Sequence, residues 1–245
     1  MQNNIYISII VPCYNESKRL NKEAFLSYVN ENSNVVFLFI NDGSKDNTLS
    51  VLNEFAVEHK NLLVLNLEIN CGKAEAVRRG MIYAYHTFHP HYIGFWDADL
   101  ATPLCELQNF IKIIQEHHFN MVTGLRLARM GAKVKRKNLR HFLGRIFATF
   151  ASCTLRLSVY DTQCGAKLYK TELIPDLFQE KFTTHWLFDV EILARYITLF
   201  GRESAIKKIY EYPLLQWEDI GGSQLKTKDF IKAPFELWKI KRKYL

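Results

Sequence analysis

The chain has 245 residues, of which 48% are hydrophobic and 23% are charged, and its formal net charge at pH 7 is +7. A chain of this length and composition can bury a sizeable core, which excludes a disordered protein and fits one large domain or two small ones. The five cysteines are odd in number and form no C-x-x-C pair, so they argue against a disulfide framework or a zinc site and for a reducing compartment.

The sequence carries no signal for secretion or membrane insertion. Its first four residues lack the basic and apolar regions of a signal peptide. No uninterrupted apolar run approaches the roughly 20 residues that a membrane-spanning helix needs. We therefore expect a soluble protein located in the cytoplasm.

The first half of the chain alternates predicted strands with predicted helices. Nearly continuous apolar runs predict buried strands at residues 5–11, 34–40, 61–67 and 92–96, and a shorter strand is expected at 121–123. Helical spacing of apolar residues follows near residue 47, after residue 73 and at 104–118. This alternation predicts an α/β fold with a mostly parallel central sheet flanked by helices.

The alternation fades after residue 124. Residues 131–137 are basic and lack periodicity, which indicates a mobile loop. A helix is expected at 138–155, with one face formed by Leu139, Phe142, Leu143, Ile146, Phe147 and Phe150. Beyond it we expect a loop and short strand at 161–169, a helix within 185–200, a strand at 207–212 and a terminal helix at 230–244. One domain over 1–245 is the organisation that this pattern favours.

The basic excess of the chain is concentrated in one interval. Between Glu116 and Asp161 there is no acidic residue, and the interval holds nine of the 32 basic ones, namely Arg126, Arg129, Lys133, Lys135, Arg136, Lys137, Arg140, Arg145 and Arg156. The rest of the chain keeps 23 basic against 25 acidic residues. We expect this interval to contact an anionic partner.

Two aspartates follow the strand predicted at 92–96. Asp97 and Asp99 come one residue apart, before a turn that Pro103 closes. Ligands of open α/β sheets bind at the carboxyl ends of the strands, and carboxylate oxygens are the ligands that Mg²⁺ or Mn²⁺ prefers. The pair therefore predicts a divalent metal site, with a polar turn as the alternative.

Polar loops also follow the first two predicted strands. A nucleotide at this edge would need a stacking partner such as Tyr14, anionic acceptors such as Glu16 and Asp42, and positive charge such as that of Lys73. The alternative is turn and capping chemistry, in which Ser44, Asp46 or Asn47 caps the next helix.

Taken together, these motifs resemble those of the family 2 glycosyltransferases with the A-type fold. The matching motifs are Val11-Pro12-x-Tyr14-Asn15-Glu16, Asn41-Asp42-Gly43-Ser44-x-Asp46, Asn70-x-Gly72-Lys73-x-x-Ala76-Val77-Arg78-x-Gly80 and Asp97-Ala98-Asp99. The resemblance implies a Rossmann-like half at residues 1–125 that holds the metal and a nucleotide-sugar donor. The donor-binding residues it implies are Pro12, Tyr14, Asn15, Glu16, Asp42, Lys73, Asp97 and Ala98.

The second half resembles the polyprenyl-phosphate sugar transferases of that family. The motifs are Asp161-Thr162-Gln163-Cys164-Gly165-x-Lys167-Leu168, His185-Trp186-x-Phe188-Asp189-Val190-Glu191 and Trp217-x-x-Ile220-x-Gly222-Ser223-x-Leu225. They are most similar to the dolichyl-phosphate β-glucosyltransferase branch, then to the dolichyl-phosphate mannosyltransferases. The resemblance implies Mg²⁺ or Mn²⁺, inversion at the anomeric carbon, a donor such as UDP-glucose or GDP-mannose, and a polyprenyl phosphate acceptor bound by residues 126–245.

Some positions depart from the pattern. Ala74-Glu75 replaces the small pair usual after the lysine, and Gln224 replaces an expected lysine. Transmembrane helices of some relatives are absent, so we expect peripheral contact at the cytoplasmic face of the membrane. The cation-rich aromatic segment Trp238–Tyr244 suits an anionic membrane interface, with a solvated helix as the alternative.

A lipid phosphate acceptor gives the basic interval a role. A phosphomonoester is largely dianionic at neutral pH, since its second pKa is roughly 6, and as a nucleophile it needs no general base. Two neighbouring anions call for cations, and Arg126 and Arg140 are our candidates for the acceptor phosphate. Asp99 is the catalytic metal ligand, while Asp161 and Asp189, and also Glu191, could orient sugar hydroxyls or arginines; loop or cap roles are the alternative.

Three other functions stay open at this stage. The same fold could transfer sugar to a carbohydrate hydroxyl, with Asp189 or Glu191 as general base. A nucleotidyltransferase would carry a Gly-rich basic loop after the first strand, where this chain has Pro-Cys-Tyr-Asn-Glu. A nucleic-acid binder could use residues 126–145, but few aromatic residues interleave with these charges and the aspartates would repel a polyanion.

Overall fold

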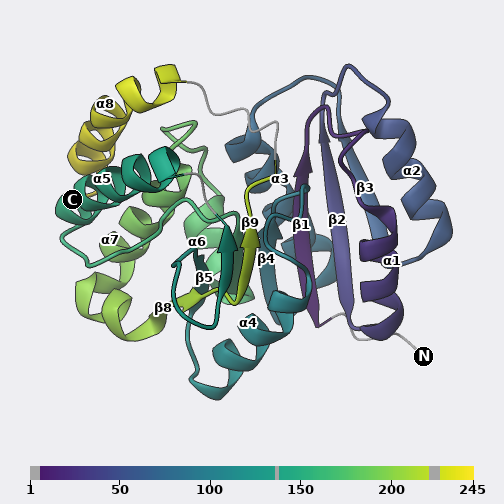
Figure 1. The fold of residues 1–245 in the computed structure, drawn as a ribbon, viewed down its shortest axis with the longest axis horizontal. Coiled ribbons are helices and arrows are strands. Elements are labelled where there is room, and N and C mark those ends of the chain that lie inside the picture. The colour runs from purple at the N-terminus through teal and green to yellow at the C-terminus, as the bar shows by residue number, and fades with distance from the viewer. Residues whose placement is uncertain (1–5, 136–137, 221–226) are drawn as a thin grey trace. The chain divides into compact units, whose positions relative to one another are not determined.

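The computed structural model describes residues 6–135, 138–220 and 227–245 of the protein (Figure 1). Contacts group the chain into two compact units. The first consists of Met1–Leu100 with Ala166–Lys181, and the second of Ala101–Gly165 with Phe182–Leu245. The organisation into one domain stays a prediction, and we describe each unit by itself.

The first unit is built on a mostly parallel sheet. The strands are β1 (Ile7–Cys13), β2 (Val35–Asp42), β3 (Leu62–Leu67), β4 (Tyr92–Trp96) and β7 (Ala166–Lys170). Their order is β3-β2-β1-β4-β7, and β7 alone runs antiparallel to its neighbour β4. Because β1, β2 and β4 are parallel, the loops that follow them lie at one edge of the sheet. The four strands predicted in this part of the sequence are confirmed.

Helices of the first unit pack on this sheet. They are α1 (Lys22–Glu31), α2 (Thr48–Glu58), α3 (Lys73–Phe88), the 3₁₀ turn η1 (Thr171–Leu173) and α6 (Ile174–Phe178). Gly80 lets α3 approach closely, because an added Cβ would lie 2.4 Å from Cγ2 of Ile10. On α1, Phe25 packs edge to face with Phe37 and Phe39 of β2. Neither α1 nor α6 was predicted from the sequence.

The second unit holds two pairs of parallel strands. β5 (Met121–Leu125) pairs with β8 (Ile209–Pro213), and β6 (Lys133–Lys135) pairs with β9 (Gln216–Glu218). The loop prediction for 131–137 is therefore wrong at residues 133–135. Their backbone groups are paired with β9, a partner more than 80 residues away in the sequence, which local periodicity cannot reveal. Residues 136 and 137 lie outside the described residues.

The helices of the second unit are α4 (Cys105–Glu116), α5 (Asn138–Leu155), α7 (Phe188–Lys208) and α8 (Thr227–Tyr244). α7 is interrupted at Gly201, which has a φ of 81°. α5 buries Phe147 but leaves Phe142 and Phe150 exposed, so the apolar face expected for this helix is only partly internal. Within the described ranges, no helix combines the length and apolar character needed to cross a membrane.

Candidate active site

The loops after β1 and β2 are joined by hydrogen bonds. The backbone N–H of Asn15 donates to Oγ of Ser44 (3.1 Å), and the side chain of Asn15 accepts from the N–H of Lys45 (2.8 Å). Asn15 has a positive φ of 55°, a conformation that asparagine tolerates better than most residues. The N–H of Glu16 donates to Oγ1 of Thr48 (2.8 Å). The two loops thus form one surface at the carboxyl end of the sheet.

Asp46 supports this surface. Burial acts to raise the pKa of Asp46, but hydrogen bonds from Ser17 and Thr48 outweigh it and lower the pKa to about 2. Oγ of Ser17 donates to Asp46 at 2.6 Å, and the N–H of Thr48 at 3.0 Å. Asp46 therefore ties Ser17 in the loop after β1 to Thr48, the first residue of α2, whose N-cap position is Asn47.

Asp42 fixes the segment that leads into α3. Its buried carboxylate accepts the N–H groups of Cys71 (2.7 Å) and Gly72 (2.8 Å). Gly43 is required beside it, because it has a φ of +60° and an added Cβ would lie 2.4 Å from the backbone nitrogen of Asn70. Asp42 thereby positions the start of α3 and, with it, Lys73. Its direct contact with a donor stays a prediction.

Three carboxylates gather at the ends of β1 and β4. Burial raises the pKa of Glu16, as do the negative charges of Asp99 and Asp97, whereas bonds from Arg19 lower it. Arg19 Nε donates to Glu16 at 2.7 Å. Nζ of Lys73 lies 2.5 Å from Oδ1 of Asp97. The edge of the sheet therefore concentrates negative charge, and the cationic side chains of Arg19 and Lys73 offset part of it.

This chemistry fits a divalent cation. Within the described part of the chain, no three His, Cys, Asp or Glu side chains are arranged as a complete metal-binding set. Mg²⁺ in particular is commonly held by one or two carboxylates, and water and substrate phosphates complete its shell. Asp97 and Asp99 supply two such carboxylates, and the negative charge of Glu16 is nearby. A cation bound to Asp97 and Asp99 would offset the negative charge of these carboxylates, which adds to burial in raising the pKa of Glu16.

The remaining donor candidates lie on the same loops. Pro12 is the last residue but one of β1 and Tyr14 follows the strand, and both are half-buried. Ala98 is buried and lies between the two aspartates in the sequence. All predicted donor residues thus belong to the first unit. Whether they contact a nucleotide stays a prediction.

In the second unit, Arg126 and Asp161 form a two-point ion pair. Nε and Nη2 of Arg126 lie 2.6 and 2.7 Å from the carboxylate oxygens of Asp161, and the Arg126 N–H adds a third bond at 3.2 Å. The guanidinium carbon is 5.4 Å from the centre of the Trp217 ring. Arg126, which was predicted to bind the acceptor phosphate, is therefore bonded to Asp161, which was predicted to be catalytic. The carboxylate of Asp161 fixes the plane of the Arg126 guanidinium.

Asp189 and Glu191 lie in the first turn of α7. Asp189 is 5% exposed, and Nε2 of Gln163 lies 3.5 Å from its Oδ2. Glu191 is fully buried and accepts bonds from Thr183, Thr184, Arg195 and Tyr244. Burial acts to raise the pKa of Glu191, but the hydrogen bonds from Thr183, Thr184 and Tyr244 outweigh it and lower the pKa. Glu191 is therefore a structural anchor and is unsuited to act as a general base.

Several predicted positions cannot be placed. The backbone of Arg140 lies in α5, but its side chain is outside the described part of the structure. Gly222, Ser223, Gln224 and Leu225 lie outside the described residues. Their proposed contacts stay predictions.

Glu75 stands where the family motif has a small residue, and its side chain has a structural role. It accepts Arg78 Nε at 2.7 Å and Arg79 Nε at 2.8 Å, and Arg78 in turn donates to the carbonyl of Gln179 at 2.9 Å. These bonds, above all those from Arg78, lower the pKa of Glu75 to about 2 against the effect of burial. The residue links α3 to the end of α6.

Two charged residues make contacts that were not predicted from the sequence, one in each unit. Arg19 could have been found from its i, i+3 spacing to Glu16. Arg145 was counted only as part of the basic interval, but its guanidinium stacks on the ring of Tyr160 at 3.4 Å and donates to the Tyr160 carbonyl at 2.9 Å. This pair involves residues 15 apart, and no local pattern predicts it.

Comparisons with known proteins agree with the architecture. The profile described as "Glycosyl transferase family 2" matches residues 8–178. The chain is 32% identical to dolichyl-phosphate beta-glucosyltransferase ALG5C of Trichomonas vaginalis over 96% of this chain and 71% of that protein. It is 30% identical to dolichyl-phosphate beta-glucosyltransferase of Dictyostelium discoideum over 97% of this chain and 78% of that protein.

Solved structures give the same answer for the fold. Glucosyl-3-phosphoglycerate synthase of Mycobacterium tuberculosis, in complex with Mn²⁺, UDP-glucose and phosphoglyceric acid, superposes with a TM-score of 0.70 at 16% identity. The match covers 97% of this chain and 80% of that one. The A-type glycosyltransferase fold expected from the sequence is confirmed.

Proposed function

The chain belongs to glycosyl transferase family 2, and from this premise we propose that it moves glucose from UDP-glucose to a polyprenyl phosphate such as dolichyl phosphate. The observation that carries the proposal is the extent of the similarity. Relatives named dolichyl-phosphate beta-glucosyltransferase match 96% to 98% of the chain, so the similarity includes the acceptor-half motifs and not the donor half alone. The family predicted from the sequence is confirmed.

The donor belongs to the first unit in this proposal. Tyr14 offers a ring for the base, and Glu16 and Asp42 offer acceptors for base or ribose. The bond from Glu16 N–H to Thr48 and those from Cys71 and Gly72 to Asp42 hold these groups in place before the donor binds. Preorganised groups lose little conformational freedom on binding.

A divalent cation is part of the proposal. Asp97 and Asp99 would hold Mg²⁺ or Mn²⁺, which when bound neutralises the charge that develops on the departing diphosphate. Support comes from the carboxylates gathered at this edge and from the same fold in structures crystallised with Mn²⁺ and UDP-glucose. Lys73 lies against Asp97 and becomes available to the diphosphate when another cation takes its place.

The acceptor is held by basic residues of the second unit. An oxygen of the lipid phosphate attacks the anomeric carbon from the face opposite the diphosphate. The new carbon–oxygen bond forms as the bond to the diphosphate breaks, and the nucleotide leaves with the electron pair. No proton has to move, because the phosphate is already a dianion. Arg126, fixed by Asp161, and Arg140 would bind this phosphate, and Asp189 would orient a sugar hydroxyl.

The enzyme would work at the cytoplasmic face of a membrane as a peripheral protein. An acceptor with a polyprenyl chain resides in the bilayer, so the enzyme has to reach the headgroup region. The Trp238–Tyr244 segment of α8, which mixes aromatic rings with cations, supports such contact.

A transfer assay with a short-chain prenyl phosphate that dissolves in water tests the function directly. We expect release of UDP from UDP-glucose and formation of a glucosyl phosphoprenol in the presence of Mg²⁺ or Mn²⁺. Parallel reactions contain GDP-mannose as donor or an oligosaccharide as acceptor. Transfer to the oligosaccharide and none to the prenyl phosphate would overturn the lipid acceptor in favour of a carbohydrate hydroxyl.

A further inference from the structure

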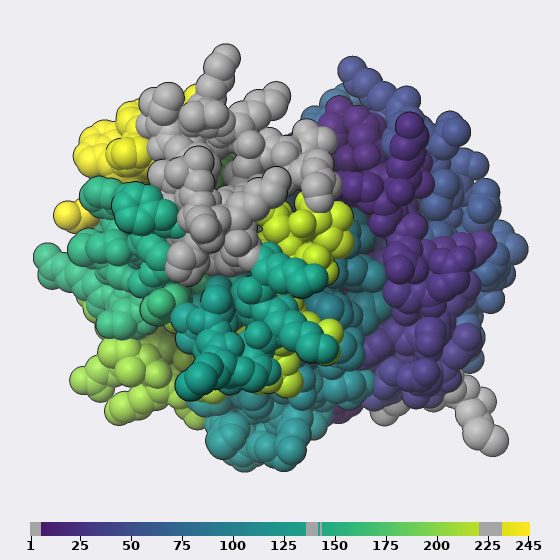
Figure 2. Space-filling view, viewed as in Figure 1, coloured from purple at the N-terminus to yellow at the C-terminus, as the bar shows by residue number. Residues whose placement is uncertain are grey.

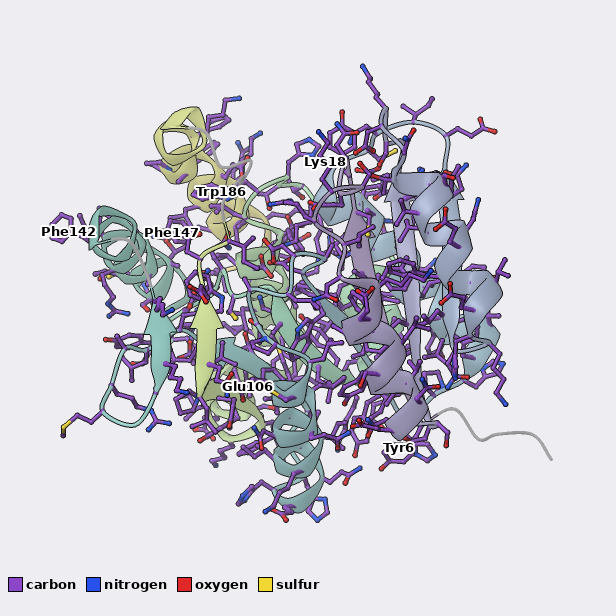
Figure 3. The ribbon with its side chains drawn as sticks, turned by 45° about the vertical axis from the view of Figure 1, so that its right-hand side comes forward. Tyr6, Lys18, Glu106, Phe142, Phe147 and Trp186 are labelled. Carbon is purple, nitrogen blue, oxygen red and sulfur yellow. The ribbon has the colours of Figure 1, made fainter. Side chains whose placement is uncertain are left out.

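The outer face of α5 carries apolar side chains one turn apart. Phe142, Ile146 and Phe150 are 62%, 41% and 60% exposed. Figure 3 shows Phe142 pointing away from the protein, whereas Phe147 points toward Trp186, with their ring centres 5.4 Å apart. The helix therefore already has a buried face, and this second apolar stripe is surplus to the core.

α8 presents aromatic rings on its own outer face. Phe235 and Trp238 are 57% and 51% exposed and stack at 5.9 Å, while Ile240 on the inner face is fully buried. The ammonium of Lys239 lies 4.6 Å from the ring centre of Phe235, and the guanidinium of Arg242 lies 5.5 Å from that of Trp238. Exposed rings bracketed by cations are typical of side chains that sit at a membrane–water interface.

The two stripes belong to helices that pack against each other within the second unit. Figure 2 shows the atoms of α8 (yellow) and α5 (teal) adjoining on one face. Together the two helices contain eight Lys or Arg residues and two acidic residues. Such charge attracts anionic lipid headgroups and opposes pairing of this face with a second copy of itself.

We propose that the two-helix face formed by Phe142, Ile146, Phe150, Phe235 and Trp238 docks on the surface of an anionic phospholipid bilayer. The apolar side chains enter the boundary between headgroups and acyl chains, and the surrounding cations contact lipid phosphates. The inference deepens the proposed function, on which it rests for its biological purpose. Its physical content is independent of catalysis, because binding requires neither a sugar donor nor a prenyl phosphate.

Co-sedimentation of the full chain with vesicles tests the docking face. The vesicles contain phosphatidylcholine with or without phosphatidylglycerol and no prenyl phosphate. The test variant combines Phe142→Gln, Ile146→Gln, Phe150→Gln and Trp238→Gln. We expect it to lose about tenfold or more of its binding to the anionic vesicles, because several side chains no longer bury apolar area. The substitutions lie at exposed positions and keep helix-forming residues.

A matched control carries Val57→Gln and Ile206→Gln, which are helical positions that are 87% and 67% exposed. We expect it to bind as the unchanged protein does. A second variant, Lys239→Gln with Arg242→Gln, keeps the aromatic rings and should lose binding to phosphatidylglycerol vesicles while its melting temperature stays the same. This variant keeps the test decisive if the first one fails to fold.

Three results would overturn the docking face. One is failure of the unchanged protein to bind anionic vesicles, and another is equal loss in the test variant and the Val57/Ile206 control. The third is a dimer in lipid-free sedimentation velocity that the test variant dissociates, which would assign the face to a second copy. If the proposed sugar transfer is wrong but the docking face is right, vesicle binding would persist while transfer to a water-soluble prenyl phosphate is absent. If docking alone fails, that transfer remains.

Discussion

Nζ of Lys73, the first residue of α3, lies 2.5 Å from Oδ1 of Asp97, the first residue after β4. The pair joins the two elements that supply positive and negative charge to the edge of the sheet. Both side chains are partly exposed, so a salt bridge of this kind contributes little to stability. We infer that its importance lies in ligand binding, where Lys73 and a divalent cation compete for Asp97.

Replacing Asp99 with Ala tests the metal ligands. We expect loss of several kcal/mol of transition-state stabilisation, equivalent to about two to three orders of magnitude in kcat. EDTA should have the same effect on the unchanged protein, and added Mn²⁺ should restore it. Circular dichroism should report the native fold for the variant. Full transfer activity in the Asp99→Ala variant, or in EDTA, would falsify the metal role.

Arg126 and Asp161 should act on the acceptor as one unit. Arg126→Gln removes a charged hydrogen-bond donor, so we expect a rise in KM for prenyl phosphate that corresponds to about 1.5–3 kcal/mol, with KM for UDP-glucose unchanged. Asp161→Asn should cause part of the same rise in KM for prenyl phosphate, because the guanidinium of Arg126 is then held less firmly in its plane. Kinetics of both single variants and the double variant give the coupling energy. Strictly additive effects would show that Asp161 does not position Arg126.

The arrangement of the loops after β1, β2 and β4 was predictable because parallel strands place their ends together. Continuous apolar runs identify β1, β2 and β4 as buried strands, and the parallel pairing of β1 with β4 brings Glu16 toward Asp97 and Asp99. The helix α1 could also have been found. Asn21 accepts a hydrogen bond from the N–H of Ala24 as an N-cap, and the buried Phe25, Tyr28 and Val29 follow at helical spacing.

The second unit depends on pairings that sequence patterns do not encode. Arg126 and Asp161 lie 35 residues apart, and β6 pairs with a strand more distant still. On α5 the apolar residues outnumber those that one face can bury. Its neighbours decide that Phe147 is internal and Phe142 external, so periodicity alone could not separate core from surface.

Glu75 should give the protein a pH-dependent contribution to stability. Its folded pKa of about 2 lies below the ordinary value, so the contribution is complete above the unfolded pKa and is lost as pH falls toward 2. We expect Glu75→Gln to lower the free energy of unfolding by about 1–3 kcal/mol at neutral pH. Urea titrations of both proteins should converge in strong acid. A constant difference down to that pH would contradict the account.

Glu191 should affect stability and leave chemistry intact. Its buried carboxylate pairs with Arg195 at 3.0 Å, so Glu191→Gln breaks a buried ion pair, at a cost of about 3–5 kcal/mol. Tyr244→Phe removes only the 2.8 Å bond to Glu191, and we expect a loss of about 1 kcal/mol with unchanged kcat. Thermal melts and kinetics on the folded fraction measure both effects. A large fall in kcat for Glu191→Gln at full folding would instead make Glu191 a catalytic group and revive the carbohydrate-hydroxyl acceptor.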